Sequence, residues 1–242
     1  MQKTKKKPTI SIITIVYNGF DVIRDTLESI VNNSHNEVEY IVIDGNSTDG
    51  TKQLIQEYSD HIDLFISEPD TGIYNAMNKG ITISQGKYIH ILNAGDSYVN
   101  NDSIDRILSI IKDKEPEFIS STVKYILPNN TVKFLSMNGG VDTICHPGLV
   151  VKSQNYKENL FDESFQFASD IEFFLRVINK SDVFITNDHY VNMPSGGLGS
   201  SIDCLKESIA IYLKYYKFDR VIFCLLKFIK IKIRLKFFRE LN

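Results

Sequence analysis

Acidic and amide side chains follow four short apolar runs in the first half of this sequence. They occur in Tyr17-Asn18, in Asp44 to Gly50, in Glu68-Pro69-Asp70 and in Asn93 to Asp96. Such carboxylates can hydrogen-bond a ribose or a base, or bind a hard divalent cation, which would stabilise a departing diphosphate. Each Asp could instead cap the next helix. That alternative is strongest for Asp49, weaker for Asp44 and weakest for Asp96, which follows a buried strand in a glycine turn.

The apolar runs alternate with segments of helical spacing as far as residue 112. Strands are predicted at Thr9–Val16, Tyr40–Ile43, Asp63–Ser67 and Lys87–Leu92, and helices at Val22–Val31, Thr51–Tyr58, Ile73–Ile83 and Ser103–Lys112. This alternation predicts a parallel sheet, in which ligands bind outside the carboxyl ends of the strands. The four polar loops are therefore expected to meet in one cleft.

The second half is less regular. A hairpin is predicted from Phe118–Ile126 and Thr131–Leu135, a helix over Asp170–Asn179, and short strands at Val183–Thr186 and Tyr190–Met193. A glycine-rich loop at Ser195–Ser200 and a helix from Ser201 to Lys217 follow. We find no internal repeat and no low-complexity linker, so one domain with a basic tail is predicted.

Charge is distributed unevenly along the 242 residues, whose net charge is -3. Residues 1–7 carry four Lys and no acid, residues 214–242 carry nine Lys or Arg and two acids, and residues 8–213 carry 14 bases and 28 acids. An acidic body with basic ends argues against nucleic acid as a partner. It suits a protein that lies on an anionic membrane while its cleft holds a cation.

Cysteine usage and the ends of the sequence favour a cytoplasmic protein. Cys145, Cys204 and Cys224 are too few and too scattered for a disulfide framework or a zinc site. Buried thiols of this kind fit a reducing compartment. No signal peptide and no membrane-spanning run are predicted.

Four segments carry motifs in a characteristic order: Thr9–Asn18, Asp44 to Thr51, Ser67 to Gly80, and Leu92-Asn93-Ala94-Gly95-Asp96. Together they resemble the family 2 glycosyltransferases of the GT-A fold. The resemblance is strong over residues 8–112 and looser to about residue 200. It implies a Rossmann-like α/β domain with a mixed central sheet flanked by helices. The implied organisation is a basic tail 1–7, a nucleotide-sugar-binding half 8–112, an acceptor-binding half 113–200, and C-terminal helices 201–242 with a basic membrane-associating tail.

The resemblance assigns donor-binding residues. In that family the end of the first strand contacts the nucleotide, and the acid that opens the second loop recognises the base. The corresponding residues here are Thr14, Tyr17 and Asn18 for the nucleotide and Asp44 for the base, with Asn46, Asp70, Asn78 and Lys79 as further nucleotide-sugar contacts. The family's Ala-Arg-Asn-x-Gly sequence reads Ala76 to Gly80 here, with Met77 in place of the arginine. Lys79 can supply a compensating charge, or it can be a solvated surface lysine.

The family's Asp-x-Asp motif, which holds the metal and the ribose, corresponds to Asn93 through Asp96. The resemblance assigns Asp96 to a divalent metal, Mn²⁺ or Mg²⁺, and Asn93, Ala94 and Gly95 to the nucleotide-sugar. Asn93 can accept a hydrogen bond from the ribose, whereas Gly95 has no ligating side chain. One carboxylate with phosphate oxygens and water suits either cation.

Inverting members use a carboxylate that removes the acceptor's hydroxyl proton. The segment Ala168 to Arg176 resembles the element that carries it, with Asp170 as the base and Ser169 in place of a Glu. Asp170 can instead be a helix N-cap, and Glu172 is the second candidate. Ser169, Arg176 and His146 are expected near the acceptor or a phosphate, although a lone His is more often structural.

Two further features have open alternatives. His189 is a minor candidate for the metal shell. Gly196 to Ser200 resemble the loop that closes over donor and acceptor, or form a plain surface loop.

Basic and apolar residues mix over residues 221–239, and they nearly alternate from Phe228 to Phe237. This pattern leaves open whether the segment is helical. Its Lys and Arg can snorkel while Phe and Ile enter a membrane interface, which predicts peripheral contact with the inner face of the plasma membrane. Packing against the domain or a partner is the alternative.

The resemblance implies an inverting, metal-dependent hexosyltransferase that moves one sugar from a UDP-sugar to a lipid-linked glycan in bacterial capsule or O-antigen assembly. The alternative is a nucleotide-sugar binding module that has lost catalysis, suggested by Met77, Asn93 and Gly95. A nucleotidyltransferase would need a glycine-rich phosphate loop after the first strand, and a Rossmann dehydrogenase would need Gly-x-Gly-x-x-Gly there. The first strand leads into Tyr17-Asn18-Gly19 instead, so both classes are disfavoured. A processive synthase would carry a Gln-x-x-Arg-Trp motif, but the sequence has no Trp.

Overall fold

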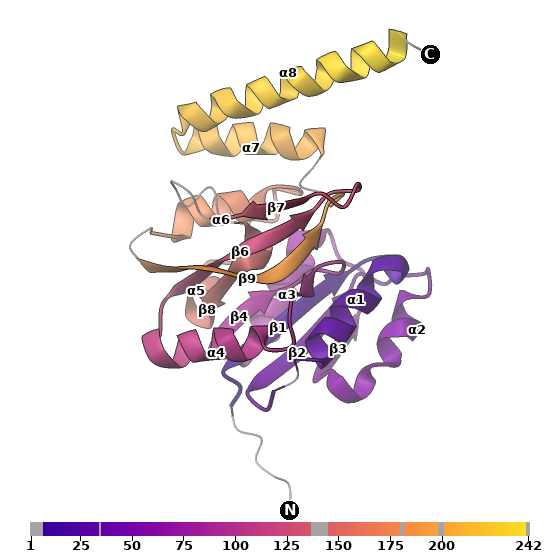
Figure 1. Ribbon diagram of the computed structural model, residues 1–242, viewed down its shortest axis with the longest axis vertical. Helices are drawn as coiled ribbons and strands as arrows, with labels where there is room; N and C mark the ends of the chain where they lie inside the picture. The colour runs from indigo at the N-terminus through magenta and orange to yellow at the C-terminus, as the bar shows by residue number, and fades with distance from the viewer. Residues whose placement is uncertain (1–6, 34, 137–144, 180–181, 198–200, 241–242) are drawn as a thin grey trace, which may run out of the picture.

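The described part of the chain is built around a single mixed β-sheet (Figure 1). The computed structural model describes residues 7–33, 35–136, 145–179, 182–197 and 201–240, with side chains in the last helix only up to residue 229. These residues form a nine-stranded sheet of order β3-β2-β1-β4-β8-β6-β9-β5, and β7 pairs with β6.

Four parallel strands make up the first half of the sheet: β3 (Leu64–Ser67), β2 (Val38–Asp44), β1 (Ile10–Val16) and β4 (Tyr88–Ile91). β1 is buried along its whole length, because helices cover both faces of the sheet. This explains its unbroken apolar, β-branched sequence. Parallel strands run in one direction, so all four carboxyl ends lie at the same edge, as the sequence predicted.

The helices cover the two faces in two groups. α1 (Phe20–Val31), α2 (Thr51–Gln56) and α4 (Ser103–Lys114) pack on one face, and α3 (Ile73–Ile83), α5 (Ser153–Glu158) and α6 (Ser169–Val177) pack on the other. Ile10 and Ile12 of β1 face the first group, and Ile13 and Ile15 face the second. Successive strand side chains point to opposite faces, so one apolar run supplies both cores.

The second half extends the same sheet. β8 (Leu149–Lys152) lies between β4 and β6 (Phe118–Ile126) and is antiparallel to both. The two halves therefore share one sheet and form the single domain that was predicted. The predicted hairpin is confirmed, since β6 turns back into β7 (Val132–Leu135).

One strand prediction is wrong. Two short strands were expected after residue 182, but the structure has one strand, β9 (Val183–Pro194), parallel to β6. The register between them shifts, so β9 bulges between Ile185 and Val191, where the sequence had predicted the gap. A bulge accommodates extra residues without ending a strand. β9 also pairs with β5 (Ser97–Tyr98), a strand that was not predicted.

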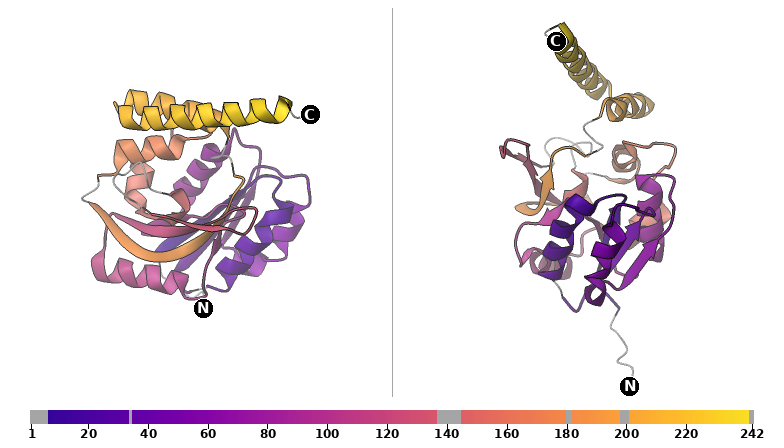
Figure 2. Two further views of the ribbon diagram at one scale, coloured as in Figure 1. Left: turned by 45° about the horizontal axis from the view of Figure 1, so that its top comes forward. Right: turned by 90° about the vertical axis from the view of Figure 1, so that its right-hand side faces the viewer.

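Two helices finish the chain. α7 (Ile202–Lys214) ends earlier than the predicted Lys217, and Tyr215-Tyr216-Lys217 connect it to α8 (Phe218–Glu240). The tail whose geometry the sequence left open is therefore helical. Figures 1 and 2 show α7 and α8 stacked beyond α6, with α8 outermost.

Candidate active site

The ends of β1, β2 and β4 lie next to one another at one edge of the sheet. Beyond the strands, Gly45 N donates to Val16 O over 2.9 Å, and Ala94 N donates to Ile15 O over 3.1 Å. The loop after β2 and the loop after β4 therefore flank the end of β1 from either side. Three of the four predicted loops therefore lie side by side at this edge.

Asp44 is fully buried and accepts hydrogen bonds from three donors. The donors are Ser47 N at 3.0 Å, Ser67 Oγ at 2.6 Å and Ser47 Oγ. Asn18 ties the same loop to β1, because its Oδ1 accepts from Thr48 N over 2.9 Å. The carboxylate predicted to recognise the base thus holds the loop that a base would contact.

Asp70 approaches this loop from the other side. Its Oδ1 accepts from Gly72 N over 3.0 Å, and a Cβ on Gly45 would come within 2.5 Å of its Oδ2. Glycine at position 45 permits this close approach. Tyr17 is 66% exposed at the same edge, and the exposed Asn46 accepts from Lys52 Nζ over 2.8 Å. These side chains could reach a nucleotide.

Three predicted donor contacts are engaged within the protein itself. Thr14 is fully buried and accepts from Tyr40 Oη over 3.1 Å. Asn78 Nδ2 donates to Phe161 O at 3.0 Å and to a Glu163 carboxylate oxygen at 2.8 Å. Lys79 Nζ lies 2.8 Å from a Glu68 carboxylate oxygen. These contacts support the sheet and its loops.

The buried position of Met77 accounts for the methionine where the family has an arginine. It is 2% exposed and lies in the core between α3 and the sheet. An arginine could not be buried there without a charged partner. Lys79, the predicted compensation, pairs with Glu68 and donates to Pro69 O over 3.1 Å.

Asp96 is a buried carboxylate in the turn after β4, with 6% of its surface exposed. Burial raises its pKa to about 8, and a backbone hydrogen bond from Asn93 offsets this only in part. Gly95 before it has a φ of 99°, which disfavours an acidic side chain at that position. A buried carboxylate without a cationic neighbour is costly, so Asp96 is suited to bind a cation.

Asp170 lies in the first turn of α6. Its Oδ1 accepts hydrogen bonds from Tyr74 Oη over 3.1 Å and from Ile171 N over 2.9 Å. Burial raises the pKa of this carboxyl, and the two hydrogen bonds oppose the rise. The N-cap of α6 is Ala168, so Asp170 does not have the capping role that was its alternative. A carboxylate fixed through one oxygen and with a raised pKa suits a general base.

The Cys145 thiol responds to the charges of both carboxylates. Burial and the charges of Asp96 and Asp170 raise the pKa of the Cys145 thiol to about 12. Cys145 precedes the short 3-10 turn His146–Gly148, which contacts β4, β6 and β9. An acid from each half of the chain therefore borders the same region.

Buried polar atoms without a hydrogen-bond partner gather around this region. Among the described residues these are Asn93 Oδ1, His146 Nε2, Tyr156 Oη, Ser169 Oγ and Asn192 Oδ1. Asn93 precedes Asp96 by three residues, Ser169 adjoins Asp170, and Asn192 pairs with Ser97. Burial, with a smaller contribution from Asp170, raises the pKa of Tyr156. Such unpartnered atoms are rare, and a bound ligand, water or ion can satisfy them.

Three of these atoms belong to residues that the sequence had singled out: Asn93, His146 and Ser169. Burial lowers the pKa of His146 to about 4, so its ring is neutral at pH 7 and one nitrogen can accept a hydrogen bond. The minor candidate His189 packs edge-on against Phe134, with ring centroids 5.4 Å apart.

The described ranges contain no group of three or more His, Cys, Asp or Glu side chains that could hold a metal ion. A divalent cation at Asp96 would therefore need oxygens from a substrate diphosphate and from water. That donor set fits the buried carboxylate and is the one that the sequence predicted.

Glu172 and Arg176 bind each other. Arg176 Nε donates to Glu172 over 3.0 Å, and Tyr215 Oη donates to Glu172 Oε1 over 2.7 Å. Arg176 Nη2 also donates to Leu160 O over 3.0 Å. These contacts join α6 to Leu160 and to Tyr215 after α7, so both side chains have a structural role.

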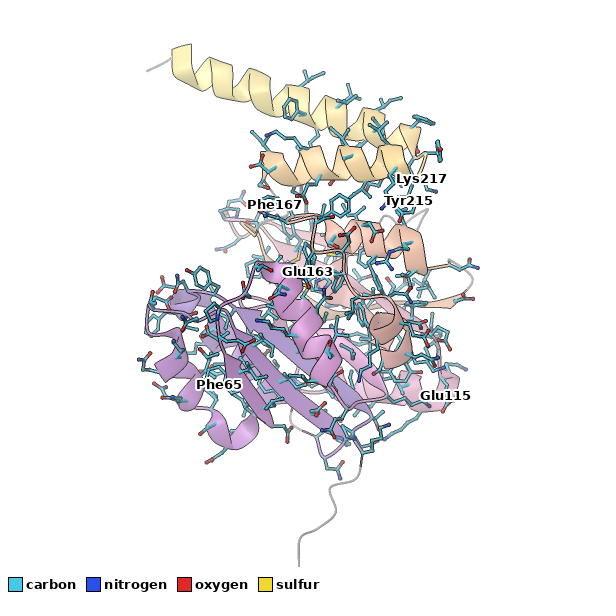
Figure 3. All side chains as sticks on the ribbon, turned by 180° about the vertical axis from the view of Figure 1, so that it is seen from behind. Phe65, Glu115, Glu163, Phe167, Tyr215 and Lys217 are labelled. Carbon is cyan, nitrogen blue, oxygen red and sulfur yellow. The ribbon has the colours of Figure 1, made fainter. Side chains whose placement is uncertain are left out.

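Sequence reasoning missed Glu207 of α7. Its carboxylate accepts hydrogen bonds from Gln166 N at 2.9 Å, Phe167 N at 2.7 Å and Ala168 N at 3.0 Å. These residues lead directly into the helix that carries Asp170, and Figure 3 marks Phe167 between α7 and the domain. A single acid in a helix gives no signal for partners 40 residues earlier.

The predicted closing loop is described only in part. Gly196 and Gly197 are exposed, and residues 198–200 lie outside the described residues.

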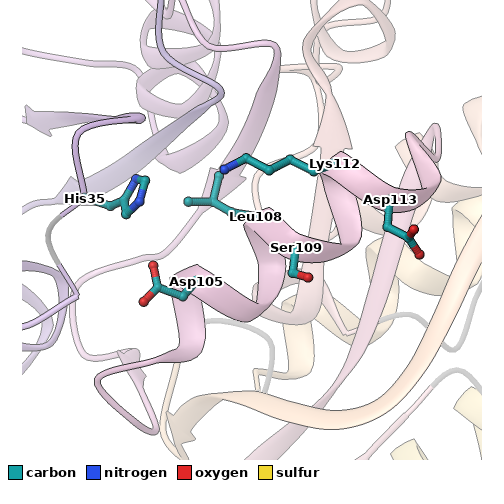
Figure 4. Close-up of a pocket in the computed structure, with 6 residues that line it drawn as sticks. All are labelled: His35, Asp105, Leu108, Ser109, Lys112 and Asp113. Carbon is teal, nitrogen blue, oxygen red and sulfur yellow. The ribbon is translucent and has the colours of Figure 1, made fainter.

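A hollow of about 480 Å³ lies elsewhere, between α4 and the chain before β2 (Figure 4). His35, Asp105 and Lys112 are among the residues that line it. It lies at the amino end of β2, and ligands of open parallel sheets bind at the carboxyl ends. We therefore assign it no part in the site.

Comparison with known proteins gives the following similarities. Residues 11–180 match the family model Glycosyl transferase family 2. The chain is 33% identical over 118 residues to the putative teichuronic acid biosynthesis glycosyltransferase TuaG of Bacillus subtilis. This alignment covers 48% of this chain and 46% of TuaG. It is 29% identical over 189 residues to an uncharacterized glycosyltransferase of Mycobacterium tuberculosis, over 70% of this chain and 68% of that protein. The match to TuaG thus spans about half of that relative.

Two solved structures resemble the fold. S. aureus TarS in complex with UDP-GlcNAc aligns with a TM-score of 0.71 and 17% identity, over 85% of this chain and 66% of that one. The mannosyltransferase PcManGT of Pyrobaculum calidifontis, in complex with GDP-Man and Mn²⁺, aligns with a TM-score of 0.68 and 16% identity, over 87% and 65%. At these identities the likeness concerns the fold alone, and the predicted GT-A fold is confirmed.

Proposed function

The chain belongs to glycosyl transferase family 2, and from this premise we propose that it transfers one sugar from a nucleotide-sugar to a glycan acceptor. The acceptor class that we propose is a growing bacterial surface polysaccharide on a lipid carrier. The similarity to TuaG, a putative teichuronic acid biosynthesis enzyme, supports that class.

One observation carries this proposal. Asp96 and Asp170, from different halves of the chain, both act on the Cys145 thiol, and unpartnered polar atoms of Asn93, His146 and Ser169 lie in the segments around them. These charges and atoms support a shared site for the nucleotide-binding loops and the proposed base. This is the arrangement that a donor and an acceptor need in order to react.

The proposed reaction is a single displacement with inversion at the anomeric carbon. The acceptor hydroxyl oxygen forms a bond to that carbon, and its proton passes to Asp170. The bond from the anomeric carbon to the diphosphate oxygen breaks, and the nucleoside diphosphate leaves with the electron pair. Tyr74 Oη, 3.1 Å from Asp170 Oδ1, fixes one carboxylate oxygen so that the other faces the proton.

Asp96 would hold a divalent cation, Mn²⁺ or Mg²⁺. When bound, the cation supplies positive charge that stabilises the departing diphosphate. Asn93 Oδ1, which has no described partner, would accept a hydrogen bond from the ribose. Burial disfavours the ionised form of Asp96, so a cation and the carboxylate stabilise each other.

We propose a UDP-sugar as the donor. The complex of the TarS structure with UDP-GlcNAc supports this choice, while the complex of PcManGT with GDP-Man makes a GDP-sugar the alternative. Asp44 and the loop it holds would meet the base.

A thermal-shift screen of UDP- and GDP-sugars, with and without Mn²⁺, tests the proposal. Ligands that bind the native state raise its melting temperature. Stabilisation by UDP-sugars with Mn²⁺, together with UDP release when a glycan acceptor is added, would support it. Stabilisation without turnover on any acceptor would favour a binding module that has lost catalysis, and no response to any nucleotide would refute both.

A further inference from the structure

α8 packs on the rest of the protein through one narrow face. Val221 and Cys224 of α8 form a buried cluster with Leu205 and Tyr212 of α7. Figures 1 and 2 show α7 between α8 and the domain, so α8 forms the outer edge of the molecule.

A second apolar face of α8 is exposed. Its members Phe218, Ile222, Leu225, Leu226 and Ile229 are between 44% and 59% exposed. Their spacing of four, three, one and three residues puts them on one side of a helix. Exposed apolar side chains gathered on one helix face favour an interaction site.

The charge of this region specifies the partner. Residues 214–242 hold nine Lys or Arg and two acids, whereas residues 8–213 hold 14 bases and 28 acids. The resulting field draws the α8 end of the molecule toward a negative surface and pushes the acidic body away from it. Two copies meeting through α8 would bring like charges together.

The length of α8 also fits a flat partner. At 1.5 Å per residue its 23 residues extend about 35 Å, against about 20 Å for the 13 residues of α7. Figure 1 shows the C-terminal end of α8 continuing past α7, so this end has no helix beneath it. None of the described helices is long and apolar enough to cross a membrane.

We propose that α8 is a membrane-docking helix that lies in the surface of an anionic bilayer. Phe218, Ile222, Leu225, Leu226 and Ile229 enter the headgroup boundary, and basic side chains among residues 214–229 contact lipid phosphates. Nearby Phe223, which is 60% exposed, widens the apolar face.

Docking would also position the active site, an extension that rests on the proposed function. α7 and the connection from α7 to α8 contact α6 and the residues before it at two places. Glu207 holds the residues before α6, and Tyr215 Oη binds Glu172 of α6. A bilayer that fixes α8 therefore fixes the orientation of Asp170 relative to a lipid-linked acceptor.

Vesicle co-sedimentation of the full chain, without any sugar nucleotide, tests the docking. Vesicles of phosphatidylcholine mixed with phosphatidylglycerol should bind the protein, vesicles of phosphatidylcholine alone should bind it weakly, and added salt should weaken the binding. The double variant L226E/I229E should bind the anionic vesicles at least about tenfold more weakly than the wild type. The matched control V132E/F134E, which adds the same charge to exposed residues of β7, should bind like the wild type.

Equal vesicle binding by L226E/I229E and the wild type would overturn the proposal. So would absence of wild-type binding, or light scattering that shows a dimer which only L226E/I229E disrupts. UDP-induced thermal stabilisation of each variant separates the two proposals. A variant that loses vesicle binding but keeps its response to UDP bears on docking alone.

Discussion

Replacing Asp96 by Asn is predicted to stabilise the metal-free protein at neutral and alkaline pH. Burial raises the pKa of Asp96 from 3.8 to about 8. Between these pH values the folded state keeps a proton that the unfolded chain has released. The free energy of unfolding therefore falls as the pH rises from about 4 to about 8. Asn has a similar shape and no charge to bury, so it removes this loss.

The size of the effect follows from the shift. Each pKa unit corresponds to about 1.4 kcal/mol, so a shift of about four units sets an upper bound of about 6 kcal/mol. Water entry and local relaxation reduce the penalty for real buried carboxylates, and we expect about 2 to 4 kcal/mol at pH 8. For a domain of this size that corresponds to a rise in Tm of about 4 to 16 °C.

The assay is thermal denaturation in EDTA at pH 4.5 and pH 8, an interval of about 3.5 pH units within the range set by the two pKa values. Asp96→Asn should melt well above the wild type at pH 8 and close to it at pH 4.5. Asp60→Asn, at an exposed acid, is the matched control and should show no such difference. Mn²⁺ with UDP should stabilise the wild type and fail to stabilise Asp96→Asn. Equal stability of Asp96→Asn and the wild type at pH 8 would refute the reasoning.

Three further predictions concern other parts of the structure. Glu207→Ala leaves three backbone N–H groups before α6 without their acceptor. Steady-state kinetics should show a lower kcat with the donor KM unchanged. A change in the donor KM alone would contradict this prediction. Burial lowers the pKa of His90 to about 4. As the pH drops from about 6.5 to 4, the unfolded chain binds a proton that the folded state does not, and the free energy of unfolding falls by at most about 3 kcal/mol. In thermal melts, His90→Gln should lose less stability over this pH range than the wild type. Asn78→Ala removes hydrogen bonds to the Phe161–Glu163 segment, and urea titrations should show that the protein is destabilised by about 2 to 3 kcal/mol. Loss of UDP binding at unchanged stability would instead support Asn78 as a contact to the donor.

The first half of the fold was predictable because its signals are local. β1 is a continuous apolar run, each helix has apolar residues at helical spacing, and the polar loops follow the strands directly. β8 and β5 were missed because they are short and depend on partners far away in the sequence. β8 pairs with β4 and β6, and neither partner leaves a pattern within the four residues of β8 itself.

The candidate site follows the same division. Asp96 and Asp170 were predicted from their motifs, and the structure gives Asp96 a buried setting and Asp170 a partly buried one, each of which suits the proposed role. Thr14, Arg176 and Glu172 carry side chains of the right type, but internal partners engage them. These internal hydrogen bonds, like those of Glu207 with the residues before α6, depend on how distant segments pack together. The spacing of residues in the sequence therefore does not predict them.

The most direct test of the proposed chemistry is turnover by Asp170→Asn. Sugar transfer from a UDP-sugar with Mn²⁺ to a lipid-linked glycan should fall by about a hundredfold or more, since a general base contributes that much. Donor binding, measured by calorimetry on the same protein, should stay at the wild-type value. Wild-type turnover by Asp170→Asn would contradict the account.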